Sequence, residues 1–216
     1  WAGNLAIDSR YKANRRDYAE VPEGENPFAQ LPLIKKALDY LGIPHREAEG
    51  VEADDFIASL VAREGAAGRG CTVVSTDSDF IQLVDERTAL YLPRGKNSIL
   101  FDRRRVRERF QIEPEEYVLY KALVGDRSDN IEGVRGIGPK TAAAILHSGG
   151  IAPYIAAHPA SKTAGTLREN RARIDQNQRL IALDRTLDTG ALAPRRPSAA
   201  LHECKTYEII AAIGER

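Results

Sequence analysis

The chain of 216 residues is long enough for one large domain or for one domain with an appended subdomain. Apolar residues make up 43% of it and charged residues 29%, and no apolar run approaches the roughly 18 residues of a transmembrane helix, which argues against a membrane-spanning protein. The net charge is zero, with 31 basic and 31 acidic residues, which taken alone argues against a nucleic-acid binder.

The charges are nevertheless unevenly distributed along the chain. Basic residues gather in 9–16 and 102–110, and acidic residues gather in 46–55 and 75–80. Separate patches of both signs suit a protein that holds cations at one place and phosphates at another. The run 102–110 is equally typical of a solvated helix face.

The first half of the chain is predicted to alternate between helices and strands. Helical apolar spacing occupies 27–41, where Gly42 and Pro44 end the pattern, and 52–64. A helical turn is expected at 77–84. Short apolar runs predict strands at 71–75, 88–93 and 98–101, the last two forming a pair, and the segment 44–50 could hold a further short strand. Such alternation implies an α/β layer with parallel pairing.

The second half is predicted to be a helical subdomain. From residue 102 onward the pattern is helical, with breaks at 133–139 and 147–151. The Pro, Gly and Ala content of 189–200 is typical of a linker or surface loop, and a short helix is expected at 206–215. We therefore expect an α/β core at 1–126 and a helical region at 127–216.

Three sets of carboxylates follow helix and strand ends. Each pair alone is typical of a helix cap or a solvated surface. Side chains two apart in an extended chain point to one side, and those three apart share a helix face, so each set is expected to present its acids together. The sets are Glu52, Asp54 and Asp55; Asp77 and Asp79; and Asp126 and Asp129.

Convergence of these sets would create a need for cations. Like charges about 4 Å apart cost roughly 1 kcal/mol per pair in water and more near protein. Carboxylate oxygens suit Mg²⁺ or Mn²⁺, whereas the histidines and cysteines show no zinc spacing. Two such ions can bracket a phosphodiester, one activating water and the other stabilising the leaving oxygen.

A glycine-rich turn stands between Asp129 and an alanine-rich helical pattern. Gly133, Gly136 and Gly138 permit a tight turn and close approach of phosphate, and Pro139 suits the first turn of the next helix. The spacing is that of neither a P-loop nor a dinucleotide-binding fingerprint. It predicts a helix–hairpin–helix turn that grips a nucleic-acid backbone, with a plain helix connector as the alternative.

A short basic stretch lies near the beginning of the chain. Tyr11 offers a stacking face, and Lys12, Arg15 and Arg16 recur at nearby helical positions. Such a patch could steady a scissile phosphate as it gains charge.

The motifs "YKANR", "GVEADD", "STDSDF" and "GDRSDNIEGVRGIGPKTA", in this order, resemble those of the structure-specific 5′ nucleases. The resemblance is greatest to the bacterial 5′–3′ exonuclease domain of DNA polymerase I and its stand-alone flap-endonuclease relatives, and it runs from about residue 9 to about residue 185. It implies a PIN-like parallel sheet flanked by helices, a helical arch and a helix–hairpin–helix subdomain. It also implies cleavage of 5′ flaps and 5′ ends of duplex DNA with two divalent metals.

The resemblance assigns roles by position. The seven carboxylates match metal ligands, Lys12 and Arg15 match residues that contact the scissile phosphate, and 17–30 would begin the arch. The residues expected to contact DNA, with a K⁺ ion at the hairpin, are Tyr11, Arg16, Gly133, Val134, Gly136, Ile137, Gly138, Lys140 and Thr141.

The expected setting follows from the same resemblance. We expect a monomer in the bacterial cytoplasm, associated with the nucleoid, that acts with a DNA polymerase in the same chain or in trans. No membrane partner is expected.

The sequence departs from the family pattern in one respect. Family members carry two further aspartates upstream of the "YKANR" motif, and Asp8 does not replace them. We expect a fragment of a longer protein, with the first strand missing and an exposed sheet edge. The alternative is a catalytically impaired DNA-binding module. A PIN-like ribonuclease acting on RNA is disfavoured by the hairpin.

Overall fold

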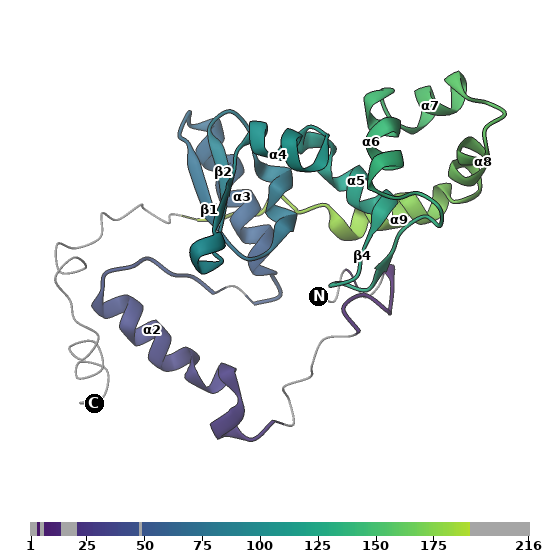
Figure 1. Ribbon diagram of the computed structural model, residues 1–216. Coiled ribbons are helices and arrows are strands. Elements are labelled where there is room, and N and C mark those ends of the chain that lie inside the picture. Colours follow the sequence, from purple (N-terminus) through teal and green to yellow (C-terminus); the bar gives the residue numbers. More distant parts are fainter. Residues whose placement is uncertain (1–3, 5–6, 14–20, 48, 191–216) are drawn as a thin grey trace. The chain divides into compact units, whose positions relative to one another are not determined.

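The computed structural model describes residues 4, 7–13, 21–47 and 49–190 (Figure 1). The chain divides into two compact units, one of Trp1–Asn14 with Gly50–Asp188 and one of Arg15–Glu49 with Thr189–Arg216. The arch segment predicted at 17–30 lies partly, and the helix predicted at 206–215 wholly, outside the described residues. The division predicted at 126/127 stays a prediction.

The second unit contains the helix that was predicted at 27–41. It begins with the short 3-10 helices η1, Glu23–Glu25, and η2, Pro27–Gln30, and continues as α2, Leu31–Tyr40. The Asn26 side chain caps η2 by accepting a hydrogen bond from the Phe28 amide at 3.0 Å. The left-handed conformation of Gly42, with φ +65°, follows the end of α2.

A three-stranded mixed sheet forms the α/β part of the first unit. Its strands β1, Cys71–Val74, β2, Thr88–Leu92, and β3, Ile99–Phe101, lie in the order β1-β2-β3. The pair β1-β2 is parallel, as predicted, whereas β2-β3 is the antiparallel pair formed by the predicted strands at 88–93 and 98–101.

The strand predicted within 44–50 is wrong. The described residues of this segment form no strand, and β1 has only β2 beside it among the strands that the structure describes. A strand forms only where a neighbour accepts its backbone hydrogen bonds, and the described residues supply none for this segment. The exposed sheet edge expected from the sequence stays a prediction.

The two faces of the sheet differ in burial because neighbouring residues of a strand point to opposite sides. Val73, Leu90 and Phe101 are paired across the strands and are buried. The helix α3, Ala53–Ala66, the 3-10 helix η3, Ser78–Leu83, and the helix α4, Arg103–Phe110, contact the strands. All four residues Phe80–Leu83 of η3 are buried, which anchors the segment after β1 in the core.

The helical region of the first unit is built around α5, Tyr117–Val124, which packs on α6, Pro139–His147, and α9, Arg171–Ile181. The 3-10 helix η5, Pro114–Glu116, precedes it, and α7, Ile151–Ala157, and α8, Lys162–Glu169, complete the region. The predicted breaks at 133–139 and 147–151 are confirmed. Among the described residues, no helix is long and apolar enough to cross a membrane.

A short antiparallel hairpin joins α5 to α6. Its strands are β4, Gly125–Asp126, and β5, Ile131–Glu132. The backbones approach so closely that a Cβ on Gly125 would lie 2.5 Å from the Gly133 nitrogen, and a Cβ on Gly133 would lie 2.3 Å from the Val124 oxygen. Gly125 also has φ +88°, which ends α5 and turns the chain into β4.

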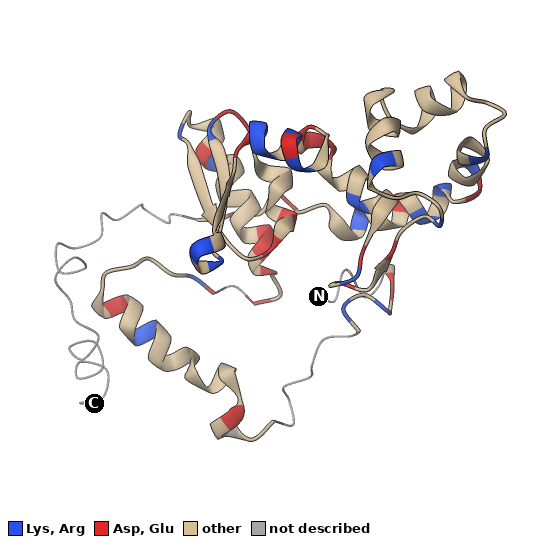
Figure 2. Cartoon of the chain, in the orientation of Figure 1, with Lys and Arg blue, Asp and Glu red and all other residues tan. Residues whose placement is uncertain are grey.

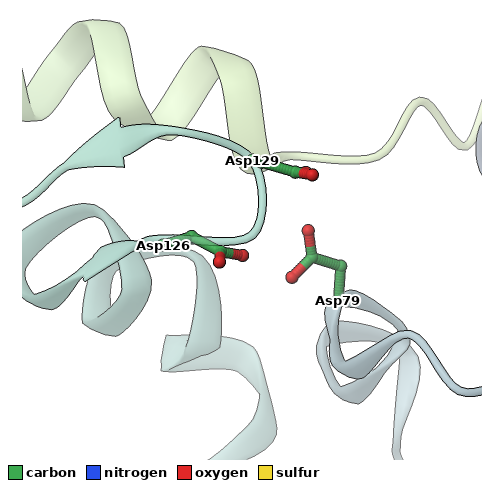
Figure 3. A group of neighbouring side chains, drawn as sticks. All are labelled: Asp79, Asp126 and Asp129. Carbon is green, nitrogen blue, oxygen red and sulfur yellow. The ribbon is translucent and has the colours of Figure 1, made fainter. Parts of the chain in front are cut away.

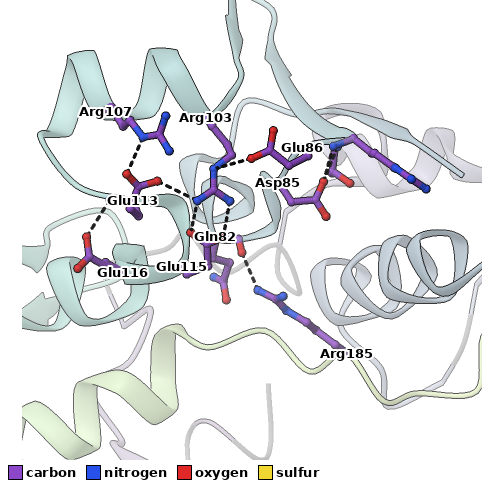
Figure 4. A network of polar contacts seen from close by, with 11 residues as sticks. Gln82, Asp85, Glu86, Arg103, Arg107, Glu113, Glu115, Glu116 and Arg185 are labelled. Carbon is purple, nitrogen blue, oxygen red and sulfur yellow. Dashed lines mark hydrogen bonds and ion pairs between the residues drawn. The ribbon is translucent and has the colours of Figure 1, made fainter. Parts of the chain in front are cut away.

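The basic run 102–110 has a structural role. Within α4, Arg103 pairs with Glu86 at 3.3 Å, with Glu113 at 2.9 Å and with Glu115 at 2.5 Å (Figure 4). Arg107 also pairs with Glu113. Figure 2 shows basic and acidic positions intermixed around α4, whereas acidic positions gather at the N-terminal end of α3 and along β4 and β5. The network binds α4 to the segments before β2 and before α5.

Candidate active site

The first acidic set occupies the beginning of α3. Glu52 is the N-cap residue, and Asp54 and Asp55 lie in the first turn, where the helix dipole favours negative charge. Asp55 accepts a hydrogen bond from the Asp184 amide at 2.8 Å. Burial raises the pKa of Asp54, and the nearby charge of Asp77 raises it further. The beginning of α3 therefore carries all three carboxylates, although Glu52 has extended backbone just before the helix rather than a place within it.

The second set caps η3 and does not lie in extended chain, so that part of the expectation is wrong. The Asp77 carboxylate accepts a hydrogen bond from the Asp79 amide at 2.8 Å, because the chain turns into η3 directly after Asp77. Burial raises the pKa of Asp79 to about 6, Lys121 opposes the shift, and the charge of Asp77 adds to it.

The third set lies in the β4–β5 hairpin rather than on one face of a helix, which corrects the predicted local geometry. Asp126 ends β4 and accepts hydrogen bonds from the amide and hydroxyl of Ser128, at 2.8 and 2.5 Å. Asp129 stands in the turn and is buried. The helical pattern fails here because Gly125 ends α5 one residue earlier.

The second and third sets meet although the chain separates them. Ligand atoms of Asp79, Asp126 and Asp129 lie within 4.8 Å of one another, and their carboxylates point toward a common space (Figure 3). A cavity of about 220 Å³ adjoins them, and it is lined by Glu52, Asp54, Asp55, Asp77, Asp79 and Asp129. Six of the seven predicted carboxylates thus line one cavity, and Asp126 is next to Asp79.

Lys121 is a site residue that the sequence did not reveal. It is buried in α5, and its ammonium donates hydrogen bonds to the carboxylates of both Asp79 and Asp126. Burial alone would lower the pKa of Lys121, but the charges of Asp79 and Tyr117 and the hydrogen bonds to Asp126 and Asp79 together raise it. The sequence of α5 is typical of an apolar core helix. Only the position of Lys121, five residues before Asp126, could have indicated the contact.

The basic stretch near the beginning of the chain reaches the same cavity. Tyr11 and Lys12 are buried and line it, and the Lys12 ammonium lies 3.2 Å from Glu52 and 4.7 Å from the Tyr11 ring centroid. Burial raises the pKa of Tyr11 to about 12. Arg15 and Arg16 lie outside the described residues.

The end of α9 and the segment after it form another wall of the cavity. This wall, Arg179–Asp184, was not predicted from the sequence, since nothing in it resembles a site motif. Its backbone is fixed to α3 through Ser59, whose hydroxyl donates to the Asp184 carbonyl at 3.0 Å and accepts from the Leu187 amide at 3.1 Å. The wall brings one further cation, Arg179, to the cavity.

The residues of the predicted helix–hairpin–helix turn, which follows the β4–β5 hairpin, do not line the cavity. Val134 and Ile137 are buried, and the Val134 amide donates to the Leu123 carbonyl at 2.8 Å. Gly136 adopts φ +86°, and Gly138 is the N-cap of α6. Lys140 is exposed at the beginning of α6, and Thr141 is half-buried. The hydrophobic side chains therefore anchor the turn, leaving its backbone and Lys140 to face solvent.

The carboxylates fit a divalent cation. They supply only oxygen donors, which are the ligands that Mg²⁺ and Mn²⁺ prefer. They also lie so close together that a protein cation, the Lys121 ammonium, bridges two of them. The donor set therefore both suits and requires positive charge.

Two family models cover most of the chain. The 5′-3′ exonuclease N-terminal resolvase-like domain matches residues 5–111, and the 5′-3′ exonuclease C-terminal SAM fold matches residues 112–197. The chain belongs to the 5′-3′ exonuclease family. The predicted resemblance is thereby confirmed, together with a flanked sheet and a helical C-terminal part.

Individual relatives agree with this assignment. A 5′-3′ exonuclease of Aquifex aeolicus is 38% identical over 148 residues, covering 66% of this chain and 50% of the relative. A thermostable DNA polymerase I of Thermus thermophilus is 36% identical over 177 residues, covering 82% of this chain and 20% of the polymerase. The chain thus spans half or less of the length of these relatives.

A solved structure shows the same fold. The T5 5′-exonuclease with bound divalent metal ions (zinc) has a TM-score of 0.67 and 26% identity, and the match covers 84% of this chain and 70% of the other.

Proposed function

We propose that this chain is a structure-specific 5′ nuclease that hydrolyses phosphodiesters at 5′ flaps and 5′ ends of duplex DNA. The observation that carries the proposal is the convergence of three separate acidic motifs on one cavity that Lys12 also lines. Family membership supports it, since the T5 5′-exonuclease binds divalent metal ions and the Aquifex relative is named a 5′-3′ exonuclease.

Two divalent cations, Mg²⁺ or Mn²⁺, are the proposed cofactors. Asp79, Asp126 and Asp129 would hold one, and the remaining ligands would be Glu52, Asp54, Asp55 and Asp77. When bound, the ions supply an activated water and offset the charge that develops on the leaving oxygen. Because burial raises the pKa of Asp79 to about 6, a proton competes with the cation for its carboxylate below that pH, and cation binding should weaken there.

Lys12 is proposed to contact the scissile phosphate. Its side chain is almost fully buried, and Glu52 and the Tyr11 ring fix the ammonium at the cavity wall. A cation held in this way needs little reorganisation as the phosphate gains charge. Arg15 is proposed to act beside it, and Tyr11 and Arg16 to contact the DNA strand.

The helix–hairpin–helix turn is proposed to bind the duplex backbone at a place outside the cavity. Exposed Lys140 offers a cation to phosphate. The N-terminal end of α6, which has no side-chain cap, offers backbone amides. Gly133, Val134, Gly136, Ile137, Gly138 and Thr141 would contribute mainly through the backbone, with a K⁺ ion at the turn.

A DNA polymerase is the proposed partner. The relatives include both polymerase I chains and a protein named only as an exonuclease, so the polymerase could stand in the same chain or act in trans.

The proposal is tested with a 5′-labelled flap duplex incubated with Mg²⁺, with Mn²⁺ or with EDTA. We expect metal-dependent release of a short 5′ product by the parent, and loss of about 100-fold or more in rate for Asp79→Asn with DNA binding retained. Asp175→Asn is the matched control, since Asp175 pairs only with Arg171 on the surface of α9. Binding without cleavage by the parent would contradict the proposal and favour the catalytically impaired module.

A further inference from the structure

Backbone hydrogen bonds attach the segment that carries Lys12 to the rest of the unit, in addition to the buried Tyr11 side chain and the Lys12–Glu52 ion pair. The Gln176 amide donates to the Ile7 carbonyl at 2.9 Å, and the Lys12 amide donates to the Asp129 carbonyl at 3.0 Å. The Asn130 side-chain amide donates to the Arg10 carbonyl at 2.9 Å. Two of these three contacts come from the turn that bears Asp129.

One residue in each of the two connected segments, Lys12 and Asn130, has a left-handed backbone conformation. Lys12 has φ +54° and Asn130 has φ +59°. Asparagine adopts this conformation more readily than most residues, whereas lysine does so at a cost that its surroundings must offset. Both contacts from the Asp129 turn are made just before the Lys12 Cα atom, one at the Arg10 carbonyl and one at the Lys12 amide. The conformation of Lys12 therefore depends on its neighbours rather than on its own preference.

We propose that Asn130 is a positioning residue that holds Lys12 at the cavity by fixing the Arg10 carbonyl. Its neighbour Asp129 lines the cavity, so one turn sets the place of both a carboxylate and the catalytic lysine. The inference rests on the proposed function of Lys12. Asn130 itself is exposed and does not line the cavity, so its effect on the reaction is indirect.

Asn130→Gly separates the side-chain contact from the backbone conformation, because glycine tolerates a positive φ but has no amide to donate. Since small misplacements of a catalytic group are costly, we expect kcat on the flap duplex to fall by about 10- to 100-fold with KM changed less than about threefold. Asn97→Gly, the same change at an exposed position in the 3-10 helix Gly95–Asn97, is the control and should leave kcat unchanged.

A double-mutant cycle shows whether the effect passes through Lys12. In a Lys12→Ala background, Asn130→Gly should lower kcat by less than about twofold more. An equal loss in both backgrounds would overturn the proposal, as would a parent-like kcat for Asn130→Gly.

Limited trypsin digestion gives a readout that needs no activity. Release of the segment should make cleavage after Arg10 and Lys12 faster by roughly fivefold in Asn130→Gly and not in Asn97→Gly. Equal cleavage would overturn the holding role even if the parent failed to cut DNA, a failure that would by itself count against the proposed function. Faster trypsin cleavage with an unchanged kcat would overturn the positioning role.

Discussion

At the scale of single residues, charge balance dominates the site. Carboxylates within 4.8 Å of one another that are buried or half-buried cannot all stay ionised without a cation nearby. The Lys121 ammonium supplies part of this positive charge, because it donates hydrogen bonds to both Asp79 and Asp126. The lysine and the proposed divalent ion would therefore interact with the same carboxylates.

Lys121→Met tests this competition. The metal-free variant should be less stable than the parent by roughly 3 kcal/mol, since removal of one partner leaves buried charges uncompensated. Added Mn²⁺ should raise the melting temperature more in the variant than in the parent, because the ion then supplies the missing positive charge. Differential scanning calorimetry with and without Mn²⁺ measures both effects. Lys162→Met, at the exposed first position of α8, is the control, and an equal Mn²⁺ effect in Lys121→Met and parent would contradict the prediction.

At the scale of elements, arginines fix a helix rather than bind a ligand. Arg103 joins α4 to three glutamates from two neighbouring segments. The pKa of Glu113 lies below its usual 4.5 because Arg107 bonds it, and Arg103 lowers that pKa further. A carboxyl group with a lowered folded-state pKa stabilises the fold above its unfolded pKa, and this stability is lost as the pH falls through the lowered value.

Arg103→Ala should therefore destabilise the protein in a pH-dependent way. At pH 7 we expect a loss of about 1–2 kcal/mol in the free energy of unfolding, shrinking as the pH falls below about 4.5 and the glutamates become protonated. Arg104→Ala, which removes a single exposed pair with Glu108, should cost less than about 0.5 kcal/mol. Urea unfolding between pH 3.5 and 7 measures both, and a pH-independent loss in Arg103→Ala would count against the network.

At the scale of the whole molecule, the net charge is zero, but acidic and basic residues gather in different regions. Carboxylates line the cavity. Lys140, at the beginning of α6, is an exposed cation that does not line it. The proposed function therefore places binding of a duplex backbone and cleavage of a phosphodiester at separate parts of the unit, and the two should be separable by mutation.

Lys140→Ala should weaken binding without affecting cleavage of bound DNA. Loss of one phosphate contact should reduce the slope of log K against log salt by about one, equally for duplexes of different sequence. Fluorescence anisotropy in EDTA at several salt concentrations measures the slope, and single-turnover cleavage at saturating enzyme should be unchanged. Glu169→Ala, on exposed surface of α8, controls for nonspecific loss. An unchanged slope would exclude Lys140 from the phosphate contact.

The sequence predicted which acids lie close together better than it predicted how they are held. Asp126 and Asp129 were expected on a helix because the apolar spacing of α5 continues toward them, but the left-handed Gly125 ends that helix first. Lys121 escaped notice because a buried lysine in an apolar helix is recognisable only once its carboxylate partners are located. The strand expected within 44–50 needed a neighbour that local pattern does not supply.

The close backbone approach at Gly125 and Gly133 has a consequence for comparisons among homologous proteins. A methyl group at either position would overlap main-chain atoms, so any chain that keeps this hairpin must keep both glycines. Selection should therefore preserve them as strictly as the carboxylates beside them, although neither glycine has a side chain to offer a ligand. Invariance in this part of an alignment would then reflect the room available to the backbone as much as the chemistry of the reaction.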